Sequence, residues 1–327
     1  MNQRLSVWST APTTARLQRG DRYVDGSAEH PAKMLPALAR HAITTYTKPG
    51  DLVLDPMCGI GTTLVEAVHL GRHALGTEYE PKWAHLAAAN LRHADRQGAT
   101  GGGEVFCGDA RQLTAHVPAH FHGLVDLIVT SPPYGPSVHG QVRSSRESGE
   151  RGVTKTHYRY SADRHNLAHV GLDALLEGFT EILTQCRHLL RPGGHIVITT
   201  RPWREQGELV DLPTGVLTAV ENAGLIPVER NVALLAGIRE GRLIARPSFF
   251  QMKNVGDARR AGIPLSLIAH EDTLVAVRAS FPEASEKRRD ENRSRRRATR
   301  PCRVRKPRTA ATFRARACTA KARHAGH

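Results

Sequence analysis

The stretch Asp51-Leu-Val-Leu-Asp-Pro-Met-Cys-Gly-Ile-Gly-Thr-Thr63 predicts the fold of this chain. Its three consecutive apolar residues, 52–54, are typical of a strand that is buried on both faces of a parallel sheet. The strand stops at Asp55, and Gly59 and Gly61 permit a tight turn in which a ligand can lie against the main chain. An apolar-periodic helix follows the second glycine, so the stretch predicts a strand-turn-helix that binds a ligand.

The next strand, expected at residues 73–78, indicates what kind of ligand this is. It ends at Glu78, about 20 residues beyond the turn, where a carboxylate typically binds ribose hydroxyls. The third glycine of a dinucleotide fingerprint is missing, and Asp55 would repel a phosphate. The pattern therefore predicts a nucleotide-like ligand with a cationic or amino-bearing group, with a ligand-free turn as the alternative.

These residues resemble motif I of S-adenosylmethionine-dependent methyltransferases, whose acid contacts the methionine end of the cofactor. Upstream, His30-Pro-Ala-Lys33 precedes a helix expected from Leu35, and this order resembles motifs X and I of the amino-methylating DNA methyltransferases, apart from Met34 in place of Pro. The resemblance implies S-adenosyl-L-methionine as cofactor and an α/β, Rossmann-like class I fold, with a mostly parallel seven-stranded sheet whose last strand is antiparallel. The cofactor-binding residues that we expect are His30, Lys33, Asp55, Pro56, Cys58, Gly59, Gly61, Thr62, Glu78 and Asp109.

Asp109 enters that set because it ends the strand and turn expected at residues 105–109. The position resembles motif III of the same family, whose acid accepts the exocyclic amine of adenine. A Gly-Asp pair after a strand is otherwise a common turn.

A second motif, Ser131-Pro-Pro-Tyr134, follows a strand expected at residues 125–130. Two prolines fix the backbone, so the hydroxyl of Ser131 and the carbonyl of Pro132 can hold a substrate amino group, and Tyr134 can stack on a planar base. The four residues resemble motif IV of enzymes that methylate exocyclic amines of bases. We therefore expect Ser131, Pro132, Pro133 and Tyr134 to be the catalytic residues.

The resemblance implies a site-specific DNA methyltransferase, and the serine form of motif IV favours N4 of cytosine over N6 of adenine. The order of the motifs, with Ala39-Arg40 and Cys58, also resembles the tRNA guanine-N2 methyltransferases, which is the alternative. A non-catalytic nucleic-acid-binding protein is a third hypothesis. The resemblance leaves open whether a partner endonuclease exists.

The net charge of +15 over 327 residues is concentrated at one end of the chain. Residues 282–327 hold 16 Lys and Arg against 4 Asp and Glu, so the rest of the chain carries only about +3. This composition predicts a disordered basic tail that binds phosphates without sequence specificity, or a dispensable solvated extension.

The remaining composition sets the domain plan and excludes other classes of protein. We expect an N-terminal arm at 1–29 and a methyltransferase domain at 30–281, with candidate target-recognition loops at 137–170 and 237–272. Five cysteines without metal-ligand spacing predict no metal and a reducing, cytoplasmic location. No apolar run has the roughly 18 residues of a membrane span.

Overall fold

The computed structural model describes residues 4–133, 141–144, 153–156, 166–167, 170–205, 208–246 and 249–280. The chain divides into two units, Met1–Ser280 and Phe281–His327. The predicted basic tail, Tyr134 and most of the predicted loop at 137–170 lie outside the described residues. Among the helices that are described, none is long and apolar enough to cross a membrane.

The first unit is built on an eight-stranded sheet with the strand order β1-β11-β14-β8-β5-β2-β3-β4. Only β14 runs antiparallel to its neighbours. The predicted Rossmann-like class I fold, a mostly parallel sheet with an antiparallel last strand, is thus confirmed. The strands are β1 (Val7–Ser9), β2 (Leu52–Asp55), β3 (His73–Glu78), β4 (Gly103–Cys107), β5 (Val125–Thr130), β8 (Leu190–Thr200), β11 (Ile226–Leu234) and β14 (His270–Val277).

The eighth strand, β1, is the difference from the seven strands expected. It comes from the predicted N-terminal arm and pairs in parallel with β11, with Trp8 opposite Ala233. Trp8 is buried while Val7 and Ser9 are exposed, so a single apolar residue attaches the strand to the core. Three residues are too short to show a period of two in the sequence.

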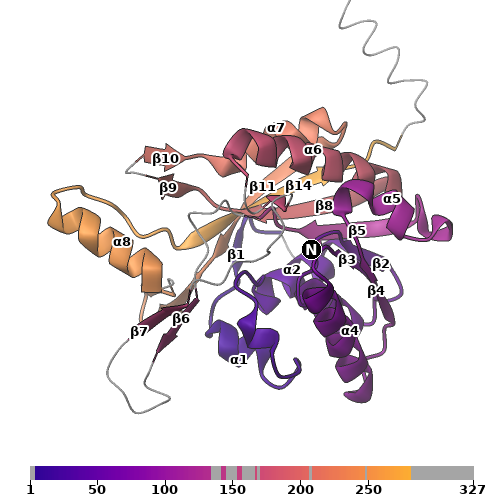
Figure 1. Cartoon of the computed structure of the whole chain (residues 1–327), viewed down its shortest axis with the longest axis horizontal. Coiled ribbons are helices and arrows are strands. Elements are labelled where there is room, and N and C mark those ends of the chain that lie inside the picture. The colour runs from indigo at the N-terminus through magenta and orange to yellow at the C-terminus, as the bar shows by residue number, and fades with distance from the viewer. Residues whose placement is uncertain are drawn as a thin grey trace, which may run out of the picture. The chain divides into compact units, whose positions relative to one another are not determined.

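Two layers of helices cover the sheet, one on each face (Figure 1). Alternate residues of a strand face opposite sides of the sheet. On one face Ile128 and Ile198 pack with α6 and α7. On the other face Val129 and Val197 pack with α2 and α3. The helices are α1 (Ala15–Arg19), α2 (Pro36–Tyr46), α3 (Thr62–His69), α4 (Pro81–Arg96), α5 (Leu113–His116), α6 (Leu172–Leu189), α7 (Leu212–Asn222) and α8 (Phe249–Arg260), with short 3-10 turns at Ser27–Glu29, Ala110–Gln112 and Ala119–Phe121.

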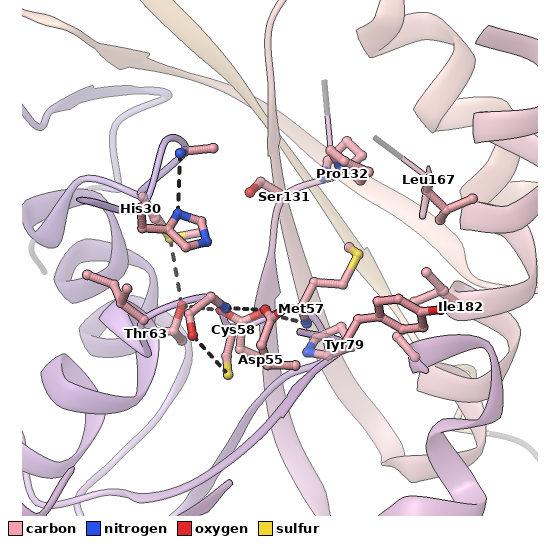
Figure 2. A pocket seen from close by; sticks show the side chains of 18 of the residues that line it. His30, Asp55, Met57, Cys58, Thr63, Tyr79, Ser131, Pro132, Leu167 and Ile182 are labelled. Atoms are coloured by element: carbon pink, nitrogen blue, oxygen red, sulfur yellow. Dashed lines mark hydrogen bonds between the residues drawn. The ribbon is translucent and has the colours of Figure 1, made fainter. Parts of the chain in front are cut away.

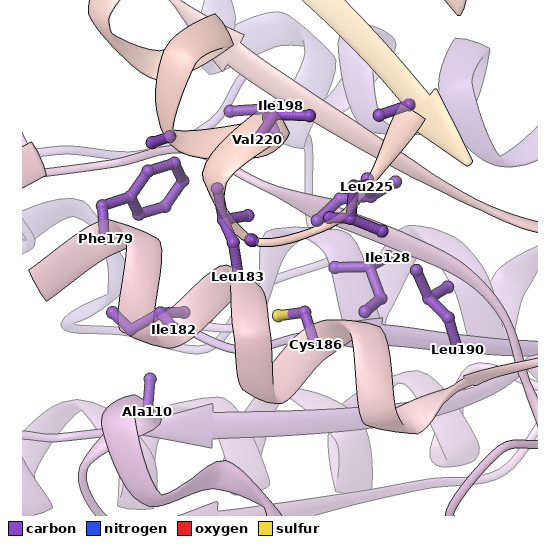
Figure 3. Packing of buried hydrophobic residues seen from close by; sticks show 14 of the residues in the cluster. Ala110, Ile128, Phe179, Ile182, Leu183, Cys186, Leu190, Ile198, Val220 and Leu225 are labelled. Atoms are coloured by element: carbon purple, nitrogen blue, oxygen red, sulfur yellow. The ribbon is translucent and has the colours of Figure 1, made fainter. Parts of the chain in front are cut away.

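The core between β5, β8 and α6 fixes the central strands of the sheet and so the position of their carboxyl ends. Phe179, Ile182 and Leu183 of α6 pack against Ile128 of β5 and Ile198 of β8 (Figure 3). The side chains of Phe179, Leu183, Ile128 and Ile198 have no exposed surface. Burial on this scale stabilises the fold by about 1.5–3 kcal/mol per large apolar side chain.

The sequence predicts a strand at residues 195–200 after a helix, but strand β8 begins five residues earlier, at Leu190. Its pairing with β5 shifts register, because Val125 lies opposite Leu190 and Leu127 lies opposite His195. The segment 191–194, Arg-Pro-Gly-Gly, is therefore a bulge inside the strand, which the sequence reads as a helix stop.

The predicted excursion at 237–272 contains a hairpin of β12 (Ala236–Arg239) and β13 (Arg242–Ala245), followed by α8. Two more hairpins, β9 (Trp203–Glu205) with β10 (Glu208–Val210), and β6 (Gln141–Ser144) with β7 (Val153–Thr156), complete the described elements. In Figure 1 the hairpins β6–β7 and β9–β10 and helix α8 lie at the left of the view.

Candidate functional site

The carboxyl ends of β2, β3 and β5 meet at one edge of the sheet, and a cavity opens there. Of the predicted site residues that are described, all but Gly61 line it. They are His30, Lys33, Asp55, Pro56, Cys58, Gly59, Thr62, Glu78, Asp109, Ser131, Pro132 and Pro133. The structure therefore brings the two predicted motifs, which are about 70 residues apart in the sequence, into a single cavity.

The glycine turn between β2 and α3 forms one part of the floor. Gly59 has φ +54° and its N–H donates to Oε2 of Glu78 at 2.8 Å. A Cβ on this glycine would lie 2.9 Å from Nε2 of His30, so the imidazole rests directly on the turn. Gly61, with φ +79°, is the N-cap of α3 and lies against Ala87 of α4, where a Cβ would be 3.2 Å from the Cβ of that alanine.

Asp55 lies at the centre of the floor, between Thr63 and Met57 (Figure 2). Its carboxylate accepts a hydrogen bond from Oγ1 of Thr63 at 2.7 Å and from the N–H of Met57 at 3.1 Å. Burial raises the pKa of Asp55 to about 6. Each oxygen has a further lone pair, so the group can still accept a hydrogen bond from a ligand or water.

Glu78 is the second buried acid of the floor, at the end of the neighbouring strand β3. It accepts hydrogen bonds from the N–H of Gly59 and, at 2.9 Å, from the N–H of Glu80. Burial raises the pKa of Glu78 to about 7, and the negative charge of Asp55 acts in the same direction. Two desolvated carboxyls side by side favour a ligand that brings a cation and hydroxyl donors.

Asp109 has a partner that the sequence did not reveal. The guanidinium of Arg111 donates to both carboxylate oxygens at 2.7–3.1 Å, and the N–H of the same residue donates to Oδ1. Burial opposes ionisation of Asp109, but the hydrogen bonds from Arg111 outweigh it and leave the pKa lower than usual. A purine amine at this position would therefore share the carboxylate with Arg111.

His30 and Lys33 form the opposite wall. The ring of His30 is buried, its Nδ1 accepts from the N–H of Ala32, and its edge meets Trp83 with centroids 4.7 Å apart. The ammonium of Lys33 donates to the carbonyls of Ala28 and His30. Burial, together with the charge of Arg19, lowers the pKa of Lys33 to about 8. In this structure Lys33 holds the wall in shape through main-chain carbonyls.

Ser131, Pro132 and Pro133 follow β5 without a break and occupy the upper rim of the cavity. Figure 2 shows Ser131 and Pro132 above the floor that carries Asp55, across from His30. The strand end is fixed, since β5 lies between β2 and β8 in the middle of the sheet. Tyr134, the fourth predicted catalytic residue, lies outside the described residues.

The sequence did not predict the apolar side of the cavity. Met57, Tyr79, Leu167 and Ile182 line it opposite His30 (Figure 2). Tyr79 carried a signal, because it follows Glu78 at the strand end, but Ile182 has the periodicity of any core residue of α6. Apolar and aromatic walls with a few fixed polar groups are typical of a site for a flat organic ligand.

The comparisons with known proteins agree with this geometry. Residues 2–89 match a family model described as DNA methylase. The chain is 38% identical over 109 residues to the tRNA (guanine(10)-N2)-dimethyltransferase of Methanothermobacter thermautotrophicus, covering 33% of this chain and 30% of that protein. It is 37% identical over 90 residues to the Type II methyltransferase M.HinfI of Haemophilus influenzae, covering 28% of this chain and 24% of that protein.

Over these segments the chain is similar to known methyltransferases. It spans less than a third of the length of the curated relatives that it matches. Among solved structures, TrmN from Thermus thermophilus is similar over 80% of this chain and 53% of that one, with a TM-score of 0.46 and 18% identity.

The cavity fits S-adenosyl-L-methionine by the chemistry of its donor set. Asp55 and Glu78 offer buried acceptors for an ammonium and for ribose hydroxyls, and the missing Cβ of Gly59 lets the His30 wall close directly onto the turn. The apolar side with Tyr79 and Ile182 suits a purine ring. None of the described residues form a group of three or more His, Cys, Asp or Glu that could hold a metal ion.

Proposed function

We propose that this chain transfers a methyl group from S-adenosyl-L-methionine to an exocyclic amino nitrogen of a base in DNA, with N4 of cytosine favoured and N6 of adenine as a second target. The supporting observation is that Ser131-Pro-Pro lies on the rim of the cavity whose floor carries Asp55, Glu78 and the glycine turn. A rim that accepts hydrogen bonds from an amine then faces a floor that suits a sulfonium cofactor.

The chain's own residues would act by holding and orienting the amine. When bound, the cofactor supplies an electrophilic methyl group on a sulfonium. The hydroxyl of Ser131 and the carbonyl of Pro132 would accept hydrogen bonds from the amino protons, which keeps the nitrogen lone pair aimed into the cavity. Alignment of this kind can supply about 7–11 kcal/mol of the barrier reduction. A base in a duplex must first be flipped out, at a cost of a few kcal/mol.

DNA is favoured over RNA because Ser131 stands where the tRNA guanine-N2 methyltransferases usually carry Asp, and because the matching family model is that of a DNA methylase. The alternative is methylation of N2 of guanine in tRNA, which the similarity to the archaeal tRNA enzyme supports. A DNA substrate would also accord with a cytoplasmic location and with a restriction-modification role, for which no partner endonuclease is identified.

The hairpin β12–β13 and helix α8 are proposed to bind the substrate backbone. They lie in the predicted recognition segment at 237–272 and carry the exposed side chains of Arg239, Arg242, Lys253, Arg259 and Arg260. Cationic side chains of this kind position a protein on phosphates without reading sequence. The basic residues at 282–327 would add a salt-dependent, non-specific contribution.

The experiment is incubation with labelled S-adenosyl-L-methionine and either unmethylated duplex DNA or unmodified tRNA, followed by analysis of the modified nucleosides. N4-methylcytosine or N6-methyladenine supports the proposal, and N2-methylguanosine supports the alternative. Absence of any label, with the cofactor bound, would refute both.

A second arm tests the role of the rim. Pro132→Ala should retain cofactor binding and slow transfer about 100-fold, the loss expected for a misplacement of about 1 Å. Pro192→Ala, at the amino end of β8, is the matched control and should be as active as the unaltered chain. Equal turnover in the two variants would remove the rim from the mechanism.

A further inference from the structure

Residues 22–34 form a strap that crosses α3 and α4 and then enters the cavity as its His30 wall. Two fully buried polar side chains hold the strap from below. Glu66 of α3 accepts from Nη1 of Arg22 at 2.8 Å and from the hydroxyl of Tyr23 at 3.1 Å. Asn90 of α4 accepts at its Oδ1 from the N–H of Val24, also at 2.8 Å.

Asn90 differs from Glu66 because it also holds the glycine turn. Its Nδ2 donates to the carbonyl of Ile60 at 2.8 Å, and Ile60 stands between Gly59 and Gly61. The same amide exchanges hydrogen bonds with Oγ of Ser27, at 3.1–3.3 Å. One side chain therefore joins the two adjoining parts of the chain, the His30 wall and the glycine turn, that bound the cofactor cavity, although it does not line that cavity itself.

The connection matters because the backbone of the glycine turn has few constraints of its own. Two glycines flank the carbonyl that Asn90 holds, and glycine has more backbone conformations to lose than any other residue. His30 lies so close to Gly59 that a Cβ would not fit, so a small shift of either the strap or the turn changes the shape of the floor. Fixing such a site before the ligand arrives lowers the cost of binding.

We propose that Asn90 is a positioning residue for the cofactor: its amide sets the glycine turn against the His30 wall and so determines the affinity for S-adenosyl-L-methionine. The inference rests on the proposed function. It assigns Asn90 no contact with cofactor or substrate, and it separates Asn90 from Glu66, which binds the strap and Arg40 of α2 but not the glycine turn.

The test is Asn90→Asp, which keeps the shape of the side chain and the acceptor for Val24 but replaces the donor to the Ile60 carbonyl by a second acceptor. We expect the dissociation constant for S-adenosyl-L-methionine, measured by calorimetry on the full chain, to rise roughly 10- to 100-fold, as a buried carbonyl loses its partner. In steady-state assays the KM for the cofactor should rise while the KM for the nucleic acid stays unchanged.

Two controls separate this effect from a loss of stability. Glu66→Gln loosens the same strap without touching the turn, and Thr47→Val removes a buried hydroxyl that bonds Arg72 near the amino end of β2. Both should change cofactor affinity much less than Asn90→Asp, at temperatures where all variants are folded. Equal or larger losses in either control, or unchanged affinity in Asn90→Asp, would overturn the inference.

Hydrogen exchange on the unaltered chain gives a readout that does not depend on the folding of a variant. Adding S-adenosyl-L-methionine should slow exchange of the N–H groups of Val24 and Gly59 together. Slowing at Gly59 alone would contradict the coupling through Asn90. If the unaltered chain binds no cofactor, the proposed function fails. If it binds the cofactor and Asn90→Asp does not change the affinity, only the role of Asn90 fails.

Discussion

Glu78 should make the cofactor-free protein more stable at pH 5 than at pH 8. Its carboxyl is 2% exposed and its pKa is raised from 4.5 to about 7, chiefly by burial. A carboxyl whose pKa is higher in the folded than in the unfolded state binds its proton more tightly when folded. Its stabilising contribution is therefore complete below pH 4.5 and is lost as the pH rises through 7.

The size of the effect follows from the two pKa values. A rise from 4.5 to about 7 corresponds to a full difference of about 3 kcal/mol between the protonated and ionised limits. Between pH 5 and pH 8, the linkage relation gives a loss of about 2.5 kcal/mol in the free energy of unfolding from Glu78 alone.

The assay is urea unfolding across this range, without cofactor, for the unaltered chain and for Glu78→Gln. The difference in the free energy of unfolding between pH 5 and pH 8 should be about 2.5 kcal/mol smaller in Glu78→Gln than in the unaltered chain, because Gln does not titrate. This holds whatever the absolute stability of the variant. Glu104→Gln, which removes an exposed carboxylate from β4, is the control for the loss of one charge and should keep the original profile. Identical profiles for the unaltered chain and Glu78→Gln would refute the reasoning.

Two further predictions concern the boundaries of the site and its substrate surface. Gly59→Ala should weaken cofactor binding, because its Cβ would meet His30 at 2.9 Å. The control is Gly98→Ala, since Gly98 also has a positive φ but has open space around it. Equal cofactor affinity in the two variants would argue against the contact. Replacing Arg239 and Arg242 together by Ala should weaken nucleic-acid binding uniformly across sequences and lower the salt slope by up to about 2. A titration in which the salt slope does not change would remove the β12–β13 hairpin from the substrate surface.

The parts of the fold that depend on residues close together in the sequence were predicted well. Strands β3 and β5 have the predicted bounds, because each is an apolar run that ends at a polar residue or a proline pair. The antiparallel last strand was also predicted, and β14 runs antiparallel to β11. Strand β1 was not predicted, because its pairing with β11 joins residues more than 220 positions apart and depends on a single buried side chain, Trp8.

The same distinction applies to the site. Asp55, Glu78 and Gly59 stand at strand ends and turns, where the local pattern carries the chemical information. The pairing of Arg111 with Asp109 is also local, but a basic residue two positions after an acid is too common to signal a contact. Ile182 lines the cavity but also packs in the core with the rest of α6, and no periodicity in a helix distinguishes such a position from other core positions.

The cofactor-binding floor and the rim that begins at Ser131 have support of different kinds. The matching family model ends at residue 89, so it includes Asp55 and Glu78 but not Ser131. The cofactor half is closed by hydrogen bonds within the chain, from Asn90 to the turn and from the turn to Glu78. DNA and tRNA methyltransferases can share such a half, since the same cofactor would serve both. Under the proposed function, the choice between N4 of cytosine and N2 of guanine would then be made by the rim that begins at Ser131 and by the hairpins. Exchanging Ser131 for Asp is the substitution that would best test whether the rim selects the base.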